Sequence, residues 1–211
     1  MKKGVFFLLF WAWMCPVWAV VEKEIDTPRH REILNQVEKA YNKMRTLTAQ
    51  FAQFNSKMKD DLQTGTIYLS KPGQMRLKYE KGSPLEFVAT GGVFIYHDKD
   101  LEQVNYFDLN STPVEWILRD KLVFDDEGFV VTDVQDVLDE YTITAHKKGA
   151  KELGELTLVI DKESLALKQW DVVDVRGIKS TVSLFDIKQN IPIDKKIFLF
   201  HGQKFVVWNQ T

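Results

Sequence analysis

The hydrophobic pattern of the chain changes its period near residue 45. Between residues 29 and 44, apolar positions recur every three or four residues and no glycine or proline interrupts them, which predicts an amphipathic helix. Asp26-Thr27-Pro28 precedes this stretch and supplies a capping side chain and a proline suited to a first helical turn. The expected apolar face of this helix consists of Ile33, Leu34, Val37, Tyr41 and Met44.

From residue 46 onward, apolar and polar residues alternate in short runs, which is typical of β-strands. Turn residues such as Lys71-Pro72-Gly73 and Gly91-Gly92 separate the runs, so consecutive strands are expected to pair antiparallel. The expected strands cover residues 46–54, 63–70, 75–79, 85–90, 93–97, 102–109, 141–147, 155–161, 166–175 and 178–188, and the tail at 197–208 could add one or two more.

The middle of the chain interrupts the series of strands. Ser111-Thr112-Pro113 again has the pattern of a helix cap followed by proline, and predicts a short helix over residues 114–120. Three large apolar residues lie within it: Trp116, Ile117 and Leu118. Residues 121–138 are mixed, and 133–138 could be helical.

These elements predict a mainly β protein with few helices, in the α+β class. An antiparallel sheet of about eleven strands tends to curl or close on itself. We therefore expect a curled sheet with a concave face that the short helices can cover. No repeat, linker or low-complexity segment divides residues 20–211, which predicts a single domain.

The first nineteen residues have the pattern of a secretory signal peptide. Lys2 and Lys3 form a positive start, an uncharged apolar run follows, and Val17-Trp18-Ala19 offers a small residue for cleavage. An uncleaved anchor is the alternative, although the apolar run is shorter than the roughly 20 residues of a membrane-spanning helix. Cys15 follows the bulky Trp13-Met14, unlike a cysteine prepared for lipid modification, so we expect an exported chain that is released untethered.

Charge and motifs narrow the range of functions. Loss of residues 1–19 would change the formal net charge from −2 to −4, and no stretch of the remaining chain is strongly basic, which argues against a nucleic-acid partner. The chain carries no nucleophile elbow, phosphate-binding loop or dinucleotide fingerprint, and its four histidines lack metal-ligand spacing. We expect no cofactor, no metal and no enzymatic activity; an enzyme that uses only carboxylates remains an alternative.

Several motifs, taken in order, resemble those of the LolA family of periplasmic lipoprotein carriers. They are Leu47-Thr48-Ala49-Gln50-Phe51-Ala52-Gln53, Gly65-Thr66-Ile67-Tyr68-Leu69-Ser70-Lys71-Pro72-Gly73, Met75-Arg76-Leu77-Lys78-Tyr79, Thr90-Gly91-Gly92-Val93-Phe94-Ile95-Tyr96 and Ser111-Thr112-Pro113. The resemblance covers essentially all of residues 20–211. It implies an incomplete antiparallel barrel closed by short helices over an apolar cavity.

The resemblance also implies roles for particular residues. The family has a basic residue before the proline, usually arginine, that helps to latch the lid; here it is Lys71, which lacks the planar fork of arginine and predicts a looser latch. Met75 and Leu77 fall where the family lines its cavity with aromatic residues. The remaining expected cavity residues are Phe51, Ile67, Leu69, Tyr79 and Phe87, with Trp116, Ile117 and Leu118 in the lid. A solvated turn lysine and ordinary core packing are the competing interpretations.

The implied cargo is triacylated lipoprotein. The resemblance implies that a monomer in the periplasm accepts it from an inner-membrane lipoprotein-releasing ABC transporter and passes it to an outer-membrane acceptor lipoprotein, where one exists. A carrier of another acyl lipid, such as a glycolipid or phospholipid, would suit an apolar cavity equally well. Two further hypotheses are a membrane-bound acceptor of the same fold and a rigid binding protein with a filled core.

Overall fold

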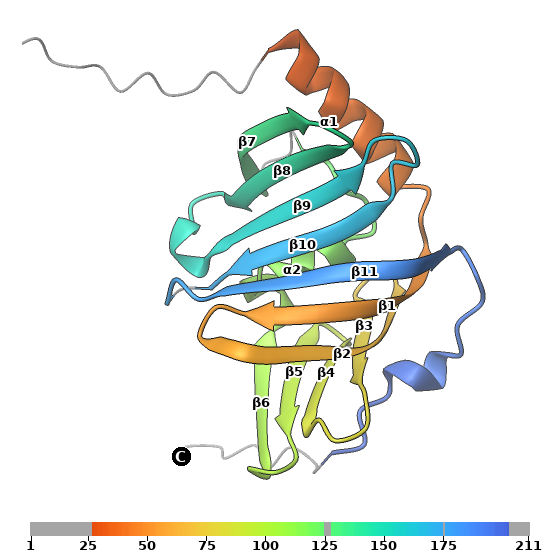
Figure 1. Cartoon of the computed structure of the whole chain (residues 1–211), viewed down its shortest axis with the longest axis vertical. Helices are drawn as coiled ribbons and strands as arrows, with labels where there is room; N and C mark the ends of the chain where they lie inside the picture. The colour runs from red at the N-terminus through yellow and green to blue at the C-terminus, as the bar shows by residue number, and fades with distance from the viewer. Residues whose placement is uncertain (1–26, 125–127, 175, 203–211) are drawn as a thin grey trace, which may run out of the picture.

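The computed structural model describes residues 27–124, 128–174 and 176–202, and within these it contains one antiparallel sheet of eleven strands (Figure 1). The strands are β1 (Thr46–Asn55), β2 (Met58–Ser70), β3 (Gln74–Tyr79), β4 (Leu85–Thr90), β5 (Val93–Asp98), β6 (Gln103–Asp108), β7 (Phe129–Val137), β8 (Glu140–Lys147), β9 (Glu155–Asp161), β10 (Leu167–Val173) and β11 (Lys179–Gln189). The helices are α1 (Pro28–Tyr41) and α2 (Val114–Leu118), and three short 3₁₀ helices are η1 (Leu109–Ser111), η2 (Lys151–Leu153) and η3 (Lys195–Phe198).

The order of the strands requires one segment of the chain to cross from one edge of the sheet to the other. The order is β6-β5-β4-β3-β2-β1-β11-β10-β9-β8-β7, so every neighbouring pair is consecutive in the chain except β1 and β11. The two edge strands, β6 and β7, are therefore consecutive in sequence but lie at opposite ends of the sheet. The chain between them has to cross from one edge to the other, and α2 lies on this crossing. We call residues 109–124 the lid segment.

Helix α1 begins where the sequence predicts. The hydroxyl of Thr27 accepts a hydrogen bond from the backbone N–H of His30 at 3.1 Å, as an N-cap residue does, and Pro28 occupies the first turn. The helix buries Ile33, Val37 and Tyr41. It lies beside the ends of the strands β7 to β10, at the upper right of Figure 1. Its apolar face therefore joins the core of the sheet.

Gly65 lies at the place where two aromatic rings meet across β2. Phe51 on β1 and Tyr79 on β3 are its partners in the two neighbouring strands, and their rings make an edge-to-face contact with centroids 5.2 Å apart. A Cβ atom at Gly65 would lie 2.2 Å from the carbonyl oxygen of Lys78. The absence of a side chain thus allows β3 to approach closely and lets the two rings cover the gap.

The outer face of β3 and β4 carries the last part of the described chain. Arg76 donates hydrogen bonds to the carbonyl oxygens of Ile197 at 2.9 Å and Leu199 at 3.0 Å, and pairs with Glu86 on β4. Phe198, at the end of η3, is 1% exposed. A turn of 3₁₀ helix therefore stands where residues 197 and 198 were predicted to begin a strand, because Asp194 caps η3 through the backbone N–H of Lys196.

The structure corrects one expected helix and shortens two others. Residues 133–138 were open to a helical interpretation, but 133–137 belong to the edge strand β7 and pair with β8. Helix α1 ends at Tyr41 instead of Met44, and helix α2 ends at Leu118 instead of residue 120. The eleven-stranded, open antiparallel sheet and the mainly β fold class are confirmed. The expected signal peptide, residues 1–19, and residues 203–208 of the expected tail strand lie outside the described residues.

Candidate functional site

The concave side of the sheet gathers the apolar residues that the sequence singled out. Six strand residues are all buried and belong to one cluster: Phe51, Ile67, Leu69, Met75, Leu77 and Tyr79. Phe87 is partly buried and packs against the same cluster. Trp116 is 0% exposed, Ile117 1% and Leu118 1%, so the lid residues complete it. The structure therefore brings together every cavity and lid residue named from the sequence.

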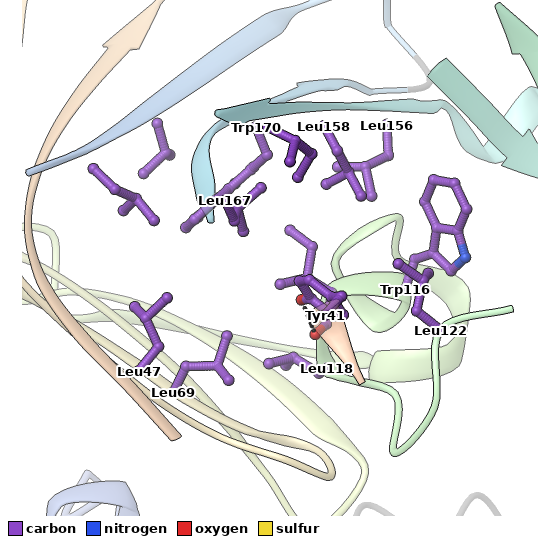
Figure 2. Close-up of a cluster of buried hydrophobic side chains, with 14 of the residues drawn as sticks. Tyr41, Leu47, Leu69, Trp116, Leu118, Leu122, Leu156, Leu158, Leu167 and Trp170 are labelled. Carbon is purple, nitrogen blue, oxygen red and sulfur yellow. Dashed lines mark hydrogen bonds between the residues drawn. The ribbon is translucent and has the colours of Figure 1, made fainter. Parts of the chain in front are cut away.

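The interior also contains residues that were not among the cavity and lid residues expected from the sequence. Strands β8 to β10 contribute Ile143, Leu156, Leu158, Leu167 and Trp170, and α1 contributes Ile33, Val37 and Tyr41. Figure 2 shows Leu156, Leu158, Leu167 and Trp170 facing Tyr41 and Leu118 across the interior. Alternation along β8 and β9 signalled that one face of each strand is apolar, but only the sheet order shows that this face lies opposite the lid segment.

Aromatic rings continue the interior towards the β6 edge. The ring of Tyr79 lies 5.9 Å from that of Phe87, which in turn lies 5.8 Å from Phe94 and 5.0 Å from Tyr96. The hydroxyl of Tyr79 donates a hydrogen bond to the side chain of Gln53, and burial raises the pKa of Tyr79 above its ordinary value. The hydroxyl of Tyr79 is thus neutral and paired with an uncharged side chain.

The lid segment is tied to the C-terminal end of α1 by polar contacts. The hydroxyl of Tyr41 donates a hydrogen bond to the carbonyl oxygen of Ile117 at 2.7 Å. The side chain of Asn42 donates to the carbonyl of Leu122 at 2.8 Å and accepts from its N–H at 2.7 Å. The carboxylate of Glu38 accepts from the N–H of Phe124 at 2.5 Å. Three side chains from one helix end thus bind four backbone groups of the lid segment.

Two further contacts fasten the lid segment to the sheet side. Arg45, just before β1, pairs with Asp120 at 2.5 Å, and both side chains are more than half exposed, so this ion pair contributes little to stability. The N–H of Gly73, in the turn between β2 and β3, donates to the carbonyl oxygen of Leu118 at 2.8 Å. A backbone contact from the Lys71-Pro72-Gly73 turn therefore reaches the lid directly.

Lys71 contacts Tyr41 at the end of α1, and Tyr41 in turn contacts the lid segment. Its ammonium group donates a hydrogen bond to the carbonyl oxygen of Tyr41 at 3.2 Å and lies 4.4 Å from the centroid of the Tyr41 ring. A cation is favoured there because the carbonyls at a helix C-terminus carry partial negative charge. Lys71 is only 7% exposed, and burial, with a smaller effect of the nearby Arg45 charge, lowers the pKa of its ammonium group to about 8. It is therefore not a solvated turn lysine.

Trp116 fills the part of the lid nearest to β7. Its ring stacks on Phe129 with centroids 4.8 Å apart, and meets Phe124 edge-on at 5.5 Å. The guanidinium group of Arg119 covers Phe129 at 4.6 Å and also binds Glu115 at 2.7 Å. The indole nitrogen of Trp116 is buried and has no hydrogen-bond partner among the described residues.

The interior is packed, and a small cavity adjoins it beside the lid segment. This cavity has a volume of about 10 Å³, and its lining includes Pro113, Phe129, Ala145, His146 and Leu156. No group of three His, Cys, Asp or Glu side chains is arranged as metal ligands within the described residues. None of the described helices is long and apolar enough to cross a membrane. The arrangement offers apolar contact surface behind a hydrogen-bonded lid.

Comparison with known proteins places this architecture in a family. The model of the family "Outer membrane lipoprotein carrier protein LolA" matches residues 42–201, which include all eleven strands. The chain belongs to the LolA family. A relative described as an outer-membrane lipoprotein carrier protein, from Methylococcus capsulatus, is 27% identical over 190 residues that cover 87% of this chain and 88% of the relative.

Solved structures resemble this LolA-family chain more distantly. A LolA superfamily protein from Nitrosomonas europaea has a TM-score of 0.45 and 9% identity, over 79% of this chain and 97% of that protein. A putative outer membrane lipoprotein-sorting protein domain from Vibrio parahaemolyticus has a TM-score of 0.48 and 8% identity, over 79% of this chain and 94% of that domain.

Proposed function

We propose that this chain carries lipoproteins through the periplasm by taking their acyl chains into the concave interior of the sheet. The observation that supports this most is the construction of the interior. Apolar side chains from both halves of the sheet face one another, and a short helix closes them in through hydrogen bonds to α1. A carrier needs a surface that is apolar inside and can be reached by moving one small segment.

The energetics of an acyl chain require such a shield. Transfer of each methylene group from water to an apolar site contributes about 0.8 kcal/mol. Exposure of three long acyl chains to water would therefore cost on the order of tens of kcal/mol. In the closed state, Trp116, Leu118 and Leu122 occupy the interior themselves. Cargo would exchange one set of apolar contacts for another, so net binding would stay moderate and release would remain feasible.

Opening would separate the lid segment from α1. The contacts to be broken are those of Tyr41, Asn42 and Glu38 with the lid backbone, each a single polar group replaceable by water. Lys71 would stay with α1, because its partners are the carbonyl and the ring of Tyr41. We therefore propose that Lys71 positions Tyr41, which in turn latches the lid, and that the residues of the interior line the acyl site.

The partners follow from this proposal. The cargo is triacylated lipoprotein, received from an inner-membrane lipoprotein-releasing ABC transporter and delivered to an acceptor at the outer membrane, by a monomer that catalyses no reaction. A second candidate is the carriage of another acyl lipid, a glycolipid or phospholipid. The same apolar interior favours it, since hydrocarbon contacts do not distinguish the headgroup that follows.

Analysis of what co-purifies with the protein from its own host tests the proposal. Mass spectrometry should detect triacylated lipoproteins bound to the protein, and depletion of the protein should leave lipoproteins at the inner membrane. Phospholipid or glycolipid as the sole bound lipid, with lipoprotein sorting unchanged, would support the second candidate. The absence of any bound lipid, together with no binding of a fluorescent fatty acyl probe, would reject both.

A further inference from the structure

Trp116 combines complete burial with an unpaired donor. Its side chain is 0% exposed, and its indole Nε1–H has no hydrogen-bond partner in the part of the chain that the structure describes. The indole N–H can only donate, and buried tryptophans usually satisfy it. Packing alone does not need this group, because the ring contacts to Phe124 and Phe129 are made by carbon faces and edges. The donor is thus an unexplained polar group among buried apolar side chains.

The backbone carbonyl groups that follow Trp116 in the lid segment bind other donors. The carbonyl oxygen of Ile117 accepts from Tyr41, and that of Leu118 accepts from Gly73. The two acceptors that follow Trp116 in the chain are therefore engaged in closing the lid. In Figure 2, the indole nitrogen lies on the side of the ring turned away from Leu158 and Leu167. The donor therefore faces away from these leucines of β9 and β10.

We propose that the Trp116 indole N–H is the hydrogen-bond donor for the carbonyl oxygen of an acyl ester of the cargo. This inference rests on the proposed function. An acyl chain buried among the leucines of β9 and β10 has its first polar atoms at the ester linkage, where the chain leaves the apolar interior. The stacking partner of Trp116, Phe129, lines the small cavity beside the lid together with Pro113 and His146. An ester carbonyl oxygen beside the indole N–H would supply the hydrogen-bond acceptor that this donor lacks in the closed state.

The consequence is a preference for acyl over alkyl lipids. An ester carbonyl oxygen accepts strongly, whereas an ether oxygen of the same lipid is a weak acceptor without the carbonyl. A buried donor that gains its first partner on binding contributes about a tenfold change in affinity. The site would therefore discriminate between ester and ether linkages as well as between acyl chains of different length.

Two lipids of equal chain length test this preference: a diacylglycerol and its dialkyl ether analogue. Displacement of a fluorescent fatty acyl probe gives the two dissociation constants for the wild type, Trp116→Phe and Tyr68→Phe. Tyr68 lies outside the interior cluster and serves as the control. We expect the wild type to favour the ester about tenfold, Trp116→Phe to lose about that factor for the ester alone, and Tyr68→Phe to retain the preference. Equal affinities for ester and ether in the wild type would overturn the inference and leave the proposed function standing.

An NMR measurement on the wild type does not depend on the folding of Trp116→Phe. A chain that begins at residue 20 contains three of the six tryptophans of the sequence, so the indole N–H resonance of Trp116 can be assigned by elimination with Trp170→Phe and Trp208→Phe. This resonance should move downfield when the ester lipid binds and stay nearly in place with the ether. The same movement with both lipids would contradict the proposed hydrogen bond. Failure of both lipids to bind would reject the proposed function itself, and the inference with it.

Discussion

The hydroxyl of Tyr41 donates a hydrogen bond of 2.7 Å to the carbonyl oxygen of Ile117, across 76 positions of the chain. The carbonyl oxygen of the same Tyr41 accepts from the ammonium group of Lys71, which also lies over its ring. One residue at the end of α1 therefore connects the turn after β2 to the lid helix. The resemblance of the sequence to a carrier family predicted a basic latch at Lys71; in the structure the ammonium group of Lys71 contacts Tyr41, and the hydroxyl of Tyr41 contacts the lid segment.

Removal of the Tyr41 hydroxyl should loosen the lid without unfolding the protein. Tyr41→Phe keeps the ring under Lys71 but leaves the carbonyl of Ile117 without its partner, which should lower the free energy of unfolding by about 1–2 kcal/mol. Urea denaturation measures this loss, and stopped-flow uptake of a fluorescent acyl probe should become faster. Tyr68→Phe, at a half-buried tyrosine on β2, is the matched control and should change neither quantity. Unchanged uptake in Tyr41→Phe would remove this hydrogen bond from the latch.

The stability contributed by Lys71 should depend on pH with a defined sign. Its pKa is about 8 in the folded protein, below the ordinary value of 10.5, because burial disfavours the charged form. Between these two values the unfolded chain binds more protons than the folded one, so stability rises with pH through this window. We expect the difference in unfolding free energy between wild type and Lys71→Met to be constant below pH 8 and to increase by up to about 3 kcal/mol towards pH 10.5.

Urea denaturation of both proteins at several pH values measures that difference and cancels titrations common to them. A difference that stays flat between pH 8 and 10.5 would show that Lys71 is solvated. Transfer of cargo provides the second readout: Lys71→Leu should alter the rate of lid release, and an unaltered rate would exclude Lys71 from the mechanism.

Asn42 should control the second half of the lid segment. Asn42→Asp exchanges the amide donor for a carboxylate oxygen that faces the carbonyl of Leu122, so one hydrogen bond becomes a repulsive contact. Hydrogen exchange at the amides of Leu122 and Phe124 should then accelerate, while exchange in β1 stays slow. Asn35→Asp, at an exposed position of the same helix, is the control. Equal exchange in both variants would mean that the lid does not depend on Asn42.

Truncation of an interior residue should lower the stability of the protein and at the same time strengthen its binding of an acyl chain. Met75→Ala removes a side chain that is 1% exposed and should lower the unfolding free energy by about 2–4 kcal/mol. Because the closed state then packs less well, the acyl probe should bind more tightly. Val88→Ala is the matched control, since Val88 is 0% exposed but lies outside the interior cluster, beside Arg76 in the register of β3 and β4. Equal effects of both substitutions on probe binding would identify Met75 as ordinary core.

The alternation of apolar and polar residues predicted the β-meander well wherever a strand buries one face and exposes the other. Along β3, for instance, Met75, Leu77 and Tyr79 are buried while their neighbours Arg76 and Lys78 are not, as strict alternation requires. The helical interpretation of residues 133–138 was wrong; it rested on the helical spacing of Val134, Val137 and Leu138. In the structure Val134 is buried, whereas Val137 and Leu138 are exposed at the end of an edge strand.

The contacts that close the interior could not be predicted from the sequence. Tyr41 and Ile117, or Asn42 and Leu122, are far apart in the chain, and both contacts use backbone groups that carry no sequence signal. The opposing wall from β8 to β10 was missed for the same reason. Its position depends on the pairing of β1 with β11, which brings the two meanders into one sheet.

Quenching of Trp170 by a brominated acyl lipid tests the central claim most directly. Trp170 is 3% exposed within the interior cluster, and Trp116→Phe with Trp208→Phe leaves it as the one tryptophan of a chain that begins at residue 20. If acyl chains enter the concave interior, saturating lipid with bromine on the acyl chain should strongly quench the fluorescence of Trp170, and the same lipid without bromine should not. Stable binding of the brominated lipid with no quenching of Trp170 would show that the chains bind elsewhere and would contradict the account.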